Sequence, residues 1–250
     1  MNFLKQESRH RAKTPLRNLL SMFLWLVLLL VAAPLATNAL TLGQIDDFQD
    51  GTPQNWGTGT TPATNIPSGG PSGSGDKYLQ FTSSGGGGSD SRMVVLNSSQ
   101  WQGDYNGAGI TGIGMDLDNF SSQSLSIRLA FFVNRTTGFV TTTPVSLGAN
   151  SGWQHATFTL TPASFTTIGS PGNFNTLLSN FTAQLRILDS GSPSLQGDSI
   201  SATLGIDNVQ AIPEPTTFLM VGLGLLTLFS AAQTVPRRRL AKSSTFKVQR

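Results

Sequence analysis

The side chains that could carry out catalysis are few, and their spacing selects no reaction. His155 is the one histidine outside the basic N-terminal segment, and no Gly-x-Ser-x-Gly turn or other spacing pairs it with a serine. The stretch Trp153–Leu160 alternates between apolar and polar residues, which places His155 on the outer face of a strand. Asp116 and Asp118 occupy same-side positions in a polar context and lack the divided roles of a glycosidase pair. We therefore expect a surface histidine and no enzyme activity.

Two aromatic residues could instead bind a sugar. Trp101 and Tyr105 lie in the polar, glycine-containing segment Trp101-Gln102-Gly103-Asp104-Tyr105. An exposed ring there could stack on a sugar, while the neighbouring Asp and Gln bond its hydroxyls. Packing in a core is the alternative for these two rings. For Trp56 and Trp153, packing in the core is what we expect.

The composition excludes several classes of protein. The chain has 250 residues, no cysteine and a sequence pI of about 9.6. Without cysteine there is no disulfide, no thiolate zinc site and no Cys nucleophile. The basic residues cluster at both ends, whereas residues 40–212 hold five Lys and Arg against eleven Asp and no Glu, a formal charge of −6. A nucleic-acid phosphate backbone would be repelled by this middle region, so we expect no nucleic-acid partner.

The N-terminal segment is typical of an export signal. Residues 1–18 are basic and polar, an apolar run follows from Leu19 to Val31, and small residues lead to Ala39. This order predicts a helical signal peptide over residues 1–39, cleaved after Ala39, with an uncleaved anchor as the alternative. Either way the following residues are exported.

The C-terminal segment combines a short polar motif, an apolar run and a basic cluster. Pro213-Glu214-Pro215 comes first, and the two prolines predict an extended, solvent-accessible stretch outside any helix. The twenty residues from Thr216 to Val235 carry no formal charge, enough for a helix of about 30 Å that spans a bilayer. Arg237, Arg238 and Arg239 follow, and such residues stay on the cytoplasmic side.

This order resembles the PEP-CTERM sorting signal of exported Gram-negative proteins. The resemblance covers residues 212–240, with residues 241–250 as a basic cytoplasmic tail. It implies an anchor in the inner membrane, recognition of Pro213-Glu214-Pro215 by a membrane-embedded exosortase, and release to the cell surface or an extracellular matrix. It also implies a setting in which exopolysaccharide is made.

The middle of the chain, residues 40–211, is predicted to be all-β. Short β-like runs alternate with clusters of Gly, Pro, Ser and Asn, and no helical period of useful length appears. We expect two antiparallel sheets packed face to face. The expected strands are Tyr78–Phe81, Met93–Leu96, Leu125–Val133, Trp153–Leu160, Phe181–Leu188 and Ser201–Ile212.

Three segments of this domain resemble the jelly-roll sandwich of carbohydrate-binding modules. They are Asp46–Gly51 with Trp56, Gly75–Leu79 and Gly205–Val209. In that fold the first and last strands are neighbours, so acidic residues from both ends of the domain can meet.

The same resemblance implies a structural calcium site. Asp47, Asp76 and Asp207 could join backbone carbonyls around Ca²⁺, a cation that takes six to eight oxygen ligands. Asp46 or Asp50 could replace Asp47 in this set. The alternative is that all are ordinary loop residues, since Asp is favoured in turns. No other cofactor is expected.

We therefore expect an exported, non-enzymatic surface or matrix protein associated with exopolysaccharide. The alternative is a lectin-like module that binds a glycan through Trp101 and Tyr105.

Overall fold

The computed structural model describes residues 40–58, 63–88 and 90–214. The signal peptide with Ala39, the apolar run after Thr216, Pro215 and the arginine cluster Arg237–Arg239 lie outside these ranges. Within them, no helix is long and apolar enough to cross a membrane.

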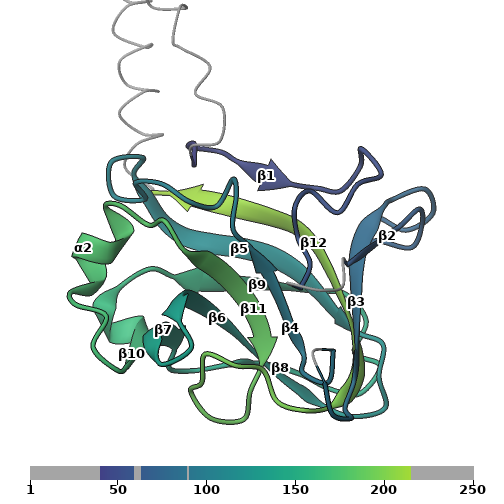
Figure 1. Ribbon diagram of the computed structural model, residues 1–250. Coiled ribbons are helices and arrows are strands. Elements are labelled where there is room, and N and C mark those ends of the chain that lie inside the picture. Colours follow the sequence, from purple (N-terminus) through teal and green to yellow (C-terminus); the bar gives the residue numbers. More distant parts are fainter. Residues whose placement is uncertain (1–39, 59–62, 89, 215–250) are drawn as a thin grey trace, which may run out of the picture. The chain divides into compact units, whose positions relative to one another are not determined.

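Two antiparallel sheets face each other, as the sequence predicts (Figure 1). The order of sheet A is β2 (Thr64–Ile66), β3 (Tyr78–Ser84), β12 (Ser201–Pro213), β5 (Ile110–Asn119) and β9 (Gln154–Thr159), with β1 (Ile45–Asp46) also pairing with β12. The order of sheet B is β10 (Phe165–Ile168), β7 (Thr137–Thr141), β6 (Leu125–Asn134), β11 (Gln184–Asp189) and β4 (Val94–Asn97), with β8 (Val145–Leu147) also on β6.

The chain crosses from one sheet to the other as it proceeds. β3, β5, β9 and β12 belong to sheet A, and β4, β6 and β11, which alternate with them, belong to sheet B. This alternation is the jelly-roll-like arrangement. The first strand pairs with the last, Ile45 opposite Gln210, so the expected neighbourhood of the two ends of the domain is confirmed.

The core fills the space between the sheets and is rich in aromatic rings. Phe131 of β6 lies at its centre, with ring centroids 5.0 Å from Phe181 and 5.4 Å from Tyr105. The helix α2 (Phe174–Leu178) adds Phe174, which is buried against Phe139 and Phe165. This short helix and a 3₁₀ turn at Pro162–Ser164 are departures from the all-strand expectation.

Each predicted strand has a counterpart, but the short strands β1, β2, β7, β8 and β10 and the ten-residue strand β5 were not among them. The inward side chains of β5, Ile113, Met115 and Leu117, are fully buried. Its other face carries Gly112, Gly114 and two aspartates, residues that are rare in strands, so the sequence pattern is weak there.

Candidate functional site

The sorting motif lies where the last strand, β12, leaves the folded domain. β12 lies between β3 and β5 and ends at Pro213, which is opposite Ile110. The next backbone N–H, of Glu214, donates a 3.0 Å hydrogen bond to the carbonyl of Gly109. Glu214 is exposed and is not helical, as predicted. Pro213 differs from the expectation of a free lead-in, because it is half-buried within the strand.

Trp101 and Tyr105 do not form a sugar platform, and that prediction is wrong. Both side chains are completely buried. Tyr105 packs against Phe131 and Phe181, and its hydroxyl donates to the Trp101 carbonyl at 2.8 Å. A ring enclosed in the core offers no face to a ligand. The polar residues around these rings form surface turns, while the rings themselves point inward.

Trp101 has a second role in the core, because its indole binds a buried carboxylate. Oδ2 of Asp46 accepts hydrogen bonds from Nε1 of Trp101 at 2.6 Å and Nε1 of Trp56 at 2.7 Å. Gln100 donates to the same oxygen at 3.1 Å. Burial raises the pKa of Asp46, while the indole and amide hydrogen bonds act in the opposite direction. Trp56 is thus a core residue, as predicted.

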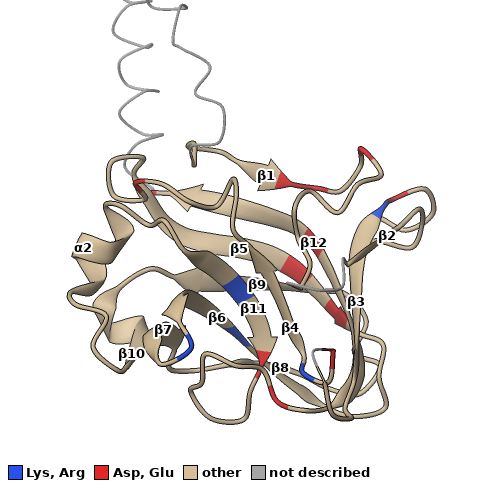
Figure 2. Ribbon diagram, in the orientation of Figure 1, with Lys and Arg blue, Asp and Glu red and all other residues tan. Residues whose placement is uncertain are grey.

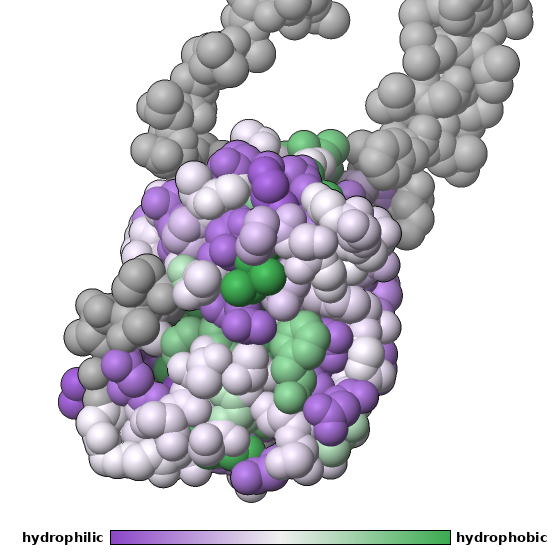
Figure 3. Space-filling model, turned by 90° about the vertical axis from the view of Figure 1, so that its right-hand side faces the viewer, coloured by the Kyte–Doolittle hydropathy of each residue, from purple (hydrophilic) through white to green (hydrophobic). Residues whose placement is uncertain are grey.

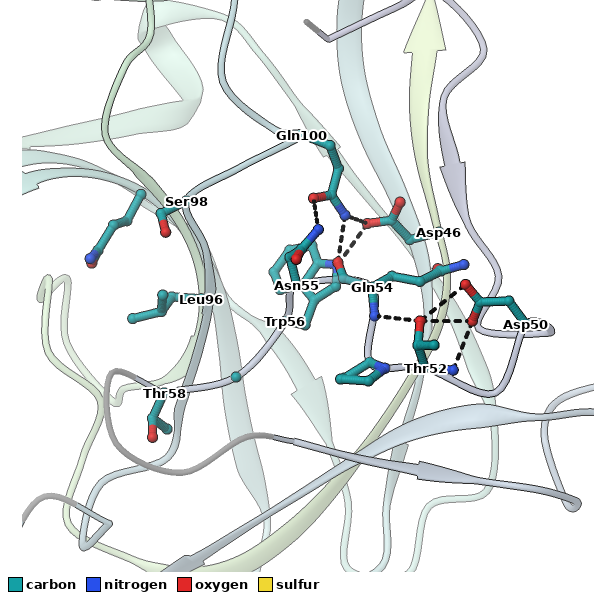
Figure 4. A pocket seen from close by; sticks show the side chains of 13 residues that line it. Asp46, Asp50, Thr52, Gln54, Asn55, Trp56, Thr58, Leu96, Ser98 and Gln100 are labelled. Carbon is teal, nitrogen blue, oxygen red and sulfur yellow. Dashed lines mark hydrogen bonds between the residues drawn. The ribbon is translucent and has the colours of Figure 1, made fainter. Parts of the chain in front are cut away.

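A polar pocket of about 930 Å³ opens beside this carboxylate (Figure 4). Gln100, Asn55 and Ser98 contribute amides and a hydroxyl to its wall, and the side chain of Leu96 adds an apolar surface. The volume falls in the usual range for small-molecule sites. No pattern in the sequence predicts this pocket, although Gln100 precedes Trp101.

The wall of the pocket is held in place by its own hydrogen bonds. Gln54 and Asn55 both have left-handed backbone conformations, with φ of 46° and 62°. Such conformations are costly outside glycine and persist where surrounding contacts determine them. Here Nε2 of Gln100 donates to the Gln54 carbonyl at 2.5 Å, and Nδ2 of Asn55 donates to Oε1 of Gln100 at 3.0 Å. A preorganised wall of amides, hydroxyls and the carboxylates of Asp46 and Asp50 suits a hydroxyl-rich ligand.

The predicted acidic residues gather at the outer face of sheet A. A Cβ added at Gly70 would lie 2.7 Å from Oδ2 of Asp76 and 3.2 Å from Oδ2 of Asp207, so both oxygens border the same space. Asp207 is fully buried, and its Oδ2 has no hydrogen-bond partner in the described part of the chain. Its pKa is raised to about 7, first by burial and then by the charges of Asp76, Asp116 and Asp47.

The structure distinguishes among the three acidic residues of the first segment. Asp47 is the one whose charge acts on Asp207, and Gln49 links it to Asp76, because Nε2 of Gln49 donates to Oδ1 of Asp76 at 2.7 Å. Asp46 is committed to the indoles, and Asp50 accepts from Thr52 in an exposed turn. No group of three or more His, Asp or Glu side chains in the described ranges could hold a metal ion. The predicted trio is therefore not brought together as one group in the described ranges, and only the carboxylates of Asp76 and Asp207 border a common space.

His155 has a partner but not the setting of a catalytic histidine. Its Nδ1 lies 2.8 Å from Oδ1 of Asp116, and its Nε2 lies 3.5 Å from the Thr157 hydroxyl. The histidine side chain is 62% exposed on the outer face of sheet A, as the alternation predicted. Asp116 is held by Asn208, whose Nδ2 donates to Oδ2 at 2.8 Å. Bulk water around such a pair weakens the electrostatic effects on which triad chemistry depends.

A small aromatic cluster covers the same face next to these residues. Trp153 packs edge-on against Tyr78 and Phe120, with ring centroids at 5.1 and 6.2 Å. Nε1 of Trp153 donates to the Gly69 carbonyl at 2.9 Å. The cluster lies over Gly205 of β12, where a Cβ would approach Phe120 and Trp153 to within 3 Å. Trp153, expected in the core, is half-buried on this outer face.

A family model described as the PEP-CTERM protein-sorting motif matches residues 211–238. The match includes Pro213-Glu214-Pro215 and the first two arginines of the basic cluster. The motif indicates an exported protein whose C-terminus is anchored in a membrane before processing by an exosortase. No curated protein matches the chain.

Solved structures with a similar arrangement include carbohydrate-active proteins. One is an exo-β-agarase, at 16% identity and a TM-score of 0.49, covering 70% of this chain and 25% of that chain. Another is a family 11 carbohydrate-binding module from Clostridium thermocellum in complex with a mixed-linked β-1,3-1,4 tetrasaccharide, at 13% identity and a TM-score of 0.43, covering 69% and 97%. The chain spans about a quarter of the length of the agarase that it matches.

Proposed function

We propose that this protein is a non-catalytic component of the cell surface or extracellular matrix, released from the inner membrane by an exosortase and associated with exopolysaccharide. The observation that carries the proposal is the position of the matched motif. β12 leads directly into it, and Glu214 lies exposed at the edge of the sandwich, outside any helix. A protease can reach a residue placed in this way without unfolding the core.

The surface of the domain supports association with a hydrated polymer. The described Lys and Arg residues are few (Figure 2), and three of the five, Arg128, Arg135 and Arg186, lie on or next to the paired strands β6 and β11. Hydrophobic residues on the face shown in Figure 3 form separate spots among polar ones. A polar, acidic surface of this kind stays soluble in a hydrated polysaccharide and does not favour tight protein contacts.

Mass spectrometry of the secreted protein tests the proposed processing. We expect the mature form to begin near Leu40 and to end close to Pro213-Glu214-Pro215, without Arg237–Arg239. In a strain that lacks the exosortase, the protein should stay in the membrane fraction at the higher mass of the uncut form, with the arginines attached. A secreted form that retains the arginine cluster would refute the proposal.

The alternative, a lectin-like module, is supported by the pocket beside Asp46 and no longer by Trp101 and Tyr105. Ser98 is exposed on its rim, so Ser98→Trp should fill the opening without disturbing the core. Glycan-array binding that is lost in Ser98→Trp and kept in Thr176→Trp, an exposed position on α2, would favour this alternative. Absence of binding in the unmodified domain would favour the structural role.

Calcium is the proposed structural ligand of Asp76 and Asp207. Its support is the buried, unpartnered Oδ2 of Asp207 next to a second carboxylate. A bound cation would neutralise the repulsion that the neighbouring aspartates exert on Asp207. No catalytic step is assigned to it.

A further inference from the structure

Both ends of the described domain are fixed to one loop. The backbone N–H of Leu40 donates to the Gln102 carbonyl at 3.1 Å, and that of Glu214 donates to the Gly109 carbonyl at 3.0 Å. Residues 102–109 therefore hold the first and the last described residues at the same end of the sandwich. We call this the terminal end, made of residues 40–45, 102–109 and 212–214; β1 and the tip of β12 lie there together in Figure 1.

The terminal end exposes two large apolar side chains. Leu42 is 45% exposed and Ile45 is 46% exposed. Ile45 lies opposite Gln210, the Ala211 N–H donates to the Gln44 carbonyl, and Leu42 lies in the turn closed by the Gln44 N–H and the Thr41 carbonyl just before this pairing. The apolar pair thus lies where the chain leaves the domain toward the sorting segment.

The charges of the terminal end are acidic. Asp104 and Glu214 are exposed there, and residues 40–45, 102–109 and 212–214 contain no Lys or Arg. Electrostatic attraction to an anionic lipid surface is therefore excluded as a source of contact by these residues. Burial of apolar side chains is the remaining source of contact between this end and a lipid surface.

The length of the connection brings this end close to a bilayer. Only Glu214 and Pro215 separate the end of β12 from the uncharged run that begins at Thr216. Three residue steps span at most about 11 Å even when fully extended. While the run is inserted, Pro213 cannot lie farther than this from the start of the run, and the rest of the terminal end surrounds Pro213.

We propose that the terminal end is a membrane-contact surface, with Leu42 and Ile45 entering the lipid headgroup region while the C-terminal anchor is in place. This inference rests on the anchoring in the proposed function and adds the face and the orientation of the domain. The contact holds Pro213 and Glu214 at the depth where a membrane-embedded protease works. Once the anchor is cut, two side chains alone give weak binding, so the domain leaves the membrane.

The absence of cysteine from the sequence makes a site-specific test clean. The full chain would be reconstituted into phosphatidylcholine vesicles with an environment-sensitive fluorophore at Ile45→Cys, and with Leu42 unchanged. The matched control is Ser201→Cys, exposed at the opposite end of β12, about 40 Å from Pro213. We expect blue-shifted emission and at least twofold quenching by spin-labelled lipids at position 45, and neither at position 201.

Three further results separate the outcomes. Adding Leu42→Ser to the Ile45→Cys protein should reduce the quenching. Replacing a third of the lipid by anionic phosphatidylglycerol should not increase it, and an increase would assign the contact to basic residues and overturn the proposal. An unquenched position 45 in protein that floats with the vesicles overturns the inference alone. Failure of the chain to float overturns the anchoring, and the inference with it.

Discussion

Nε1 of Trp101 donates a 2.6 Å hydrogen bond to Oδ2 of Asp46, a residue 55 positions earlier in the chain. Trp56 donates to the same oxygen, so one carboxylate joins β1 to two loops from different parts of the sequence. Buried carboxylates are costly unless several donors satisfy them. This group therefore has a structural role, although it borders the pocket.

Asp46→Ala should lower the free energy of unfolding by about 3 kcal/mol, because it leaves two buried indole N–H groups without an acceptor. Urea denaturation followed by tryptophan fluorescence measures this. The control is Asp50→Ala, in which an exposed turn residue is removed and the loss should be clearly smaller. Equal losses in the two variants would contradict the structural role of Asp46.

Trp101→Ala should cost about 3–5 kcal/mol of stability, since it empties the volume of a fully buried ring. The measurement is the same denaturation, with circular dichroism as the readout. A folded variant with unchanged stability would show that the ring is exposed after all, as the lectin hypothesis first required.

Gly205→Ala should destabilise the domain by about 1–3 kcal/mol, because the new methyl group would meet Phe120 and Trp153 at under 3 Å and force their rings to move. Thermal denaturation reports the loss. Gly148→Ala is the matched control, since a Cβ there meets no atom within 4 Å and its φ is not left-handed.

Asp207 should make the stability of the calcium-free domain depend on pH. Its pKa is about 7 in the folded state, above its usual value of 3.8, so between these values the folded state binds more protons than the unfolded state. In a calcium chelator the stability should therefore fall as pH rises from 4 to 7 and level off above 7. Asp207→Asn should be more stable than the unmodified domain at pH 8 and similar at pH 4. If the difference in stability between Asp207→Asn and the unmodified domain did not change between pH 4 and pH 8, the pKa of Asp207 would not be raised in the folded state.

Calcium should remove the advantage in stability that Asp207→Asn has over the unmodified domain at pH 8. Millimolar Ca²⁺ at pH 8 should raise the melting temperature of the unmodified domain by several degrees, because a ligand that binds only the folded state stabilises it. In Asp207→Asn and Asp76→Asn the increase should disappear, while Asp90→Asn serves as a control outside the acidic cluster. No shift in the unmodified domain would argue against the calcium site.

The sequence predicts the class of fold well and the ligand chemistry poorly. Alternation in Trp153–Leu160 correctly placed Ala156 and Phe158 inside and His155 outside, because period two is a local property of a strand. The ring of Trp101 was predicted to be exposed because its neighbours in the sequence are polar. Those neighbours show only that the turn is exposed. The direction of the Trp101 ring depends on Asp46, which is distant in sequence, and the pocket likewise depends on contacts between residues 54–55 and Gln100.

The position of β12 sets the order of events during export. It is the last strand to be made, yet it pairs with β1, β3 and β5, so sheet A lacks its middle until residue 213 has crossed the membrane. The match to the sorting motif begins at residue 211, inside this strand, so the segment that completes the centre of sheet A and the start of the sorting motif are the same piece of chain.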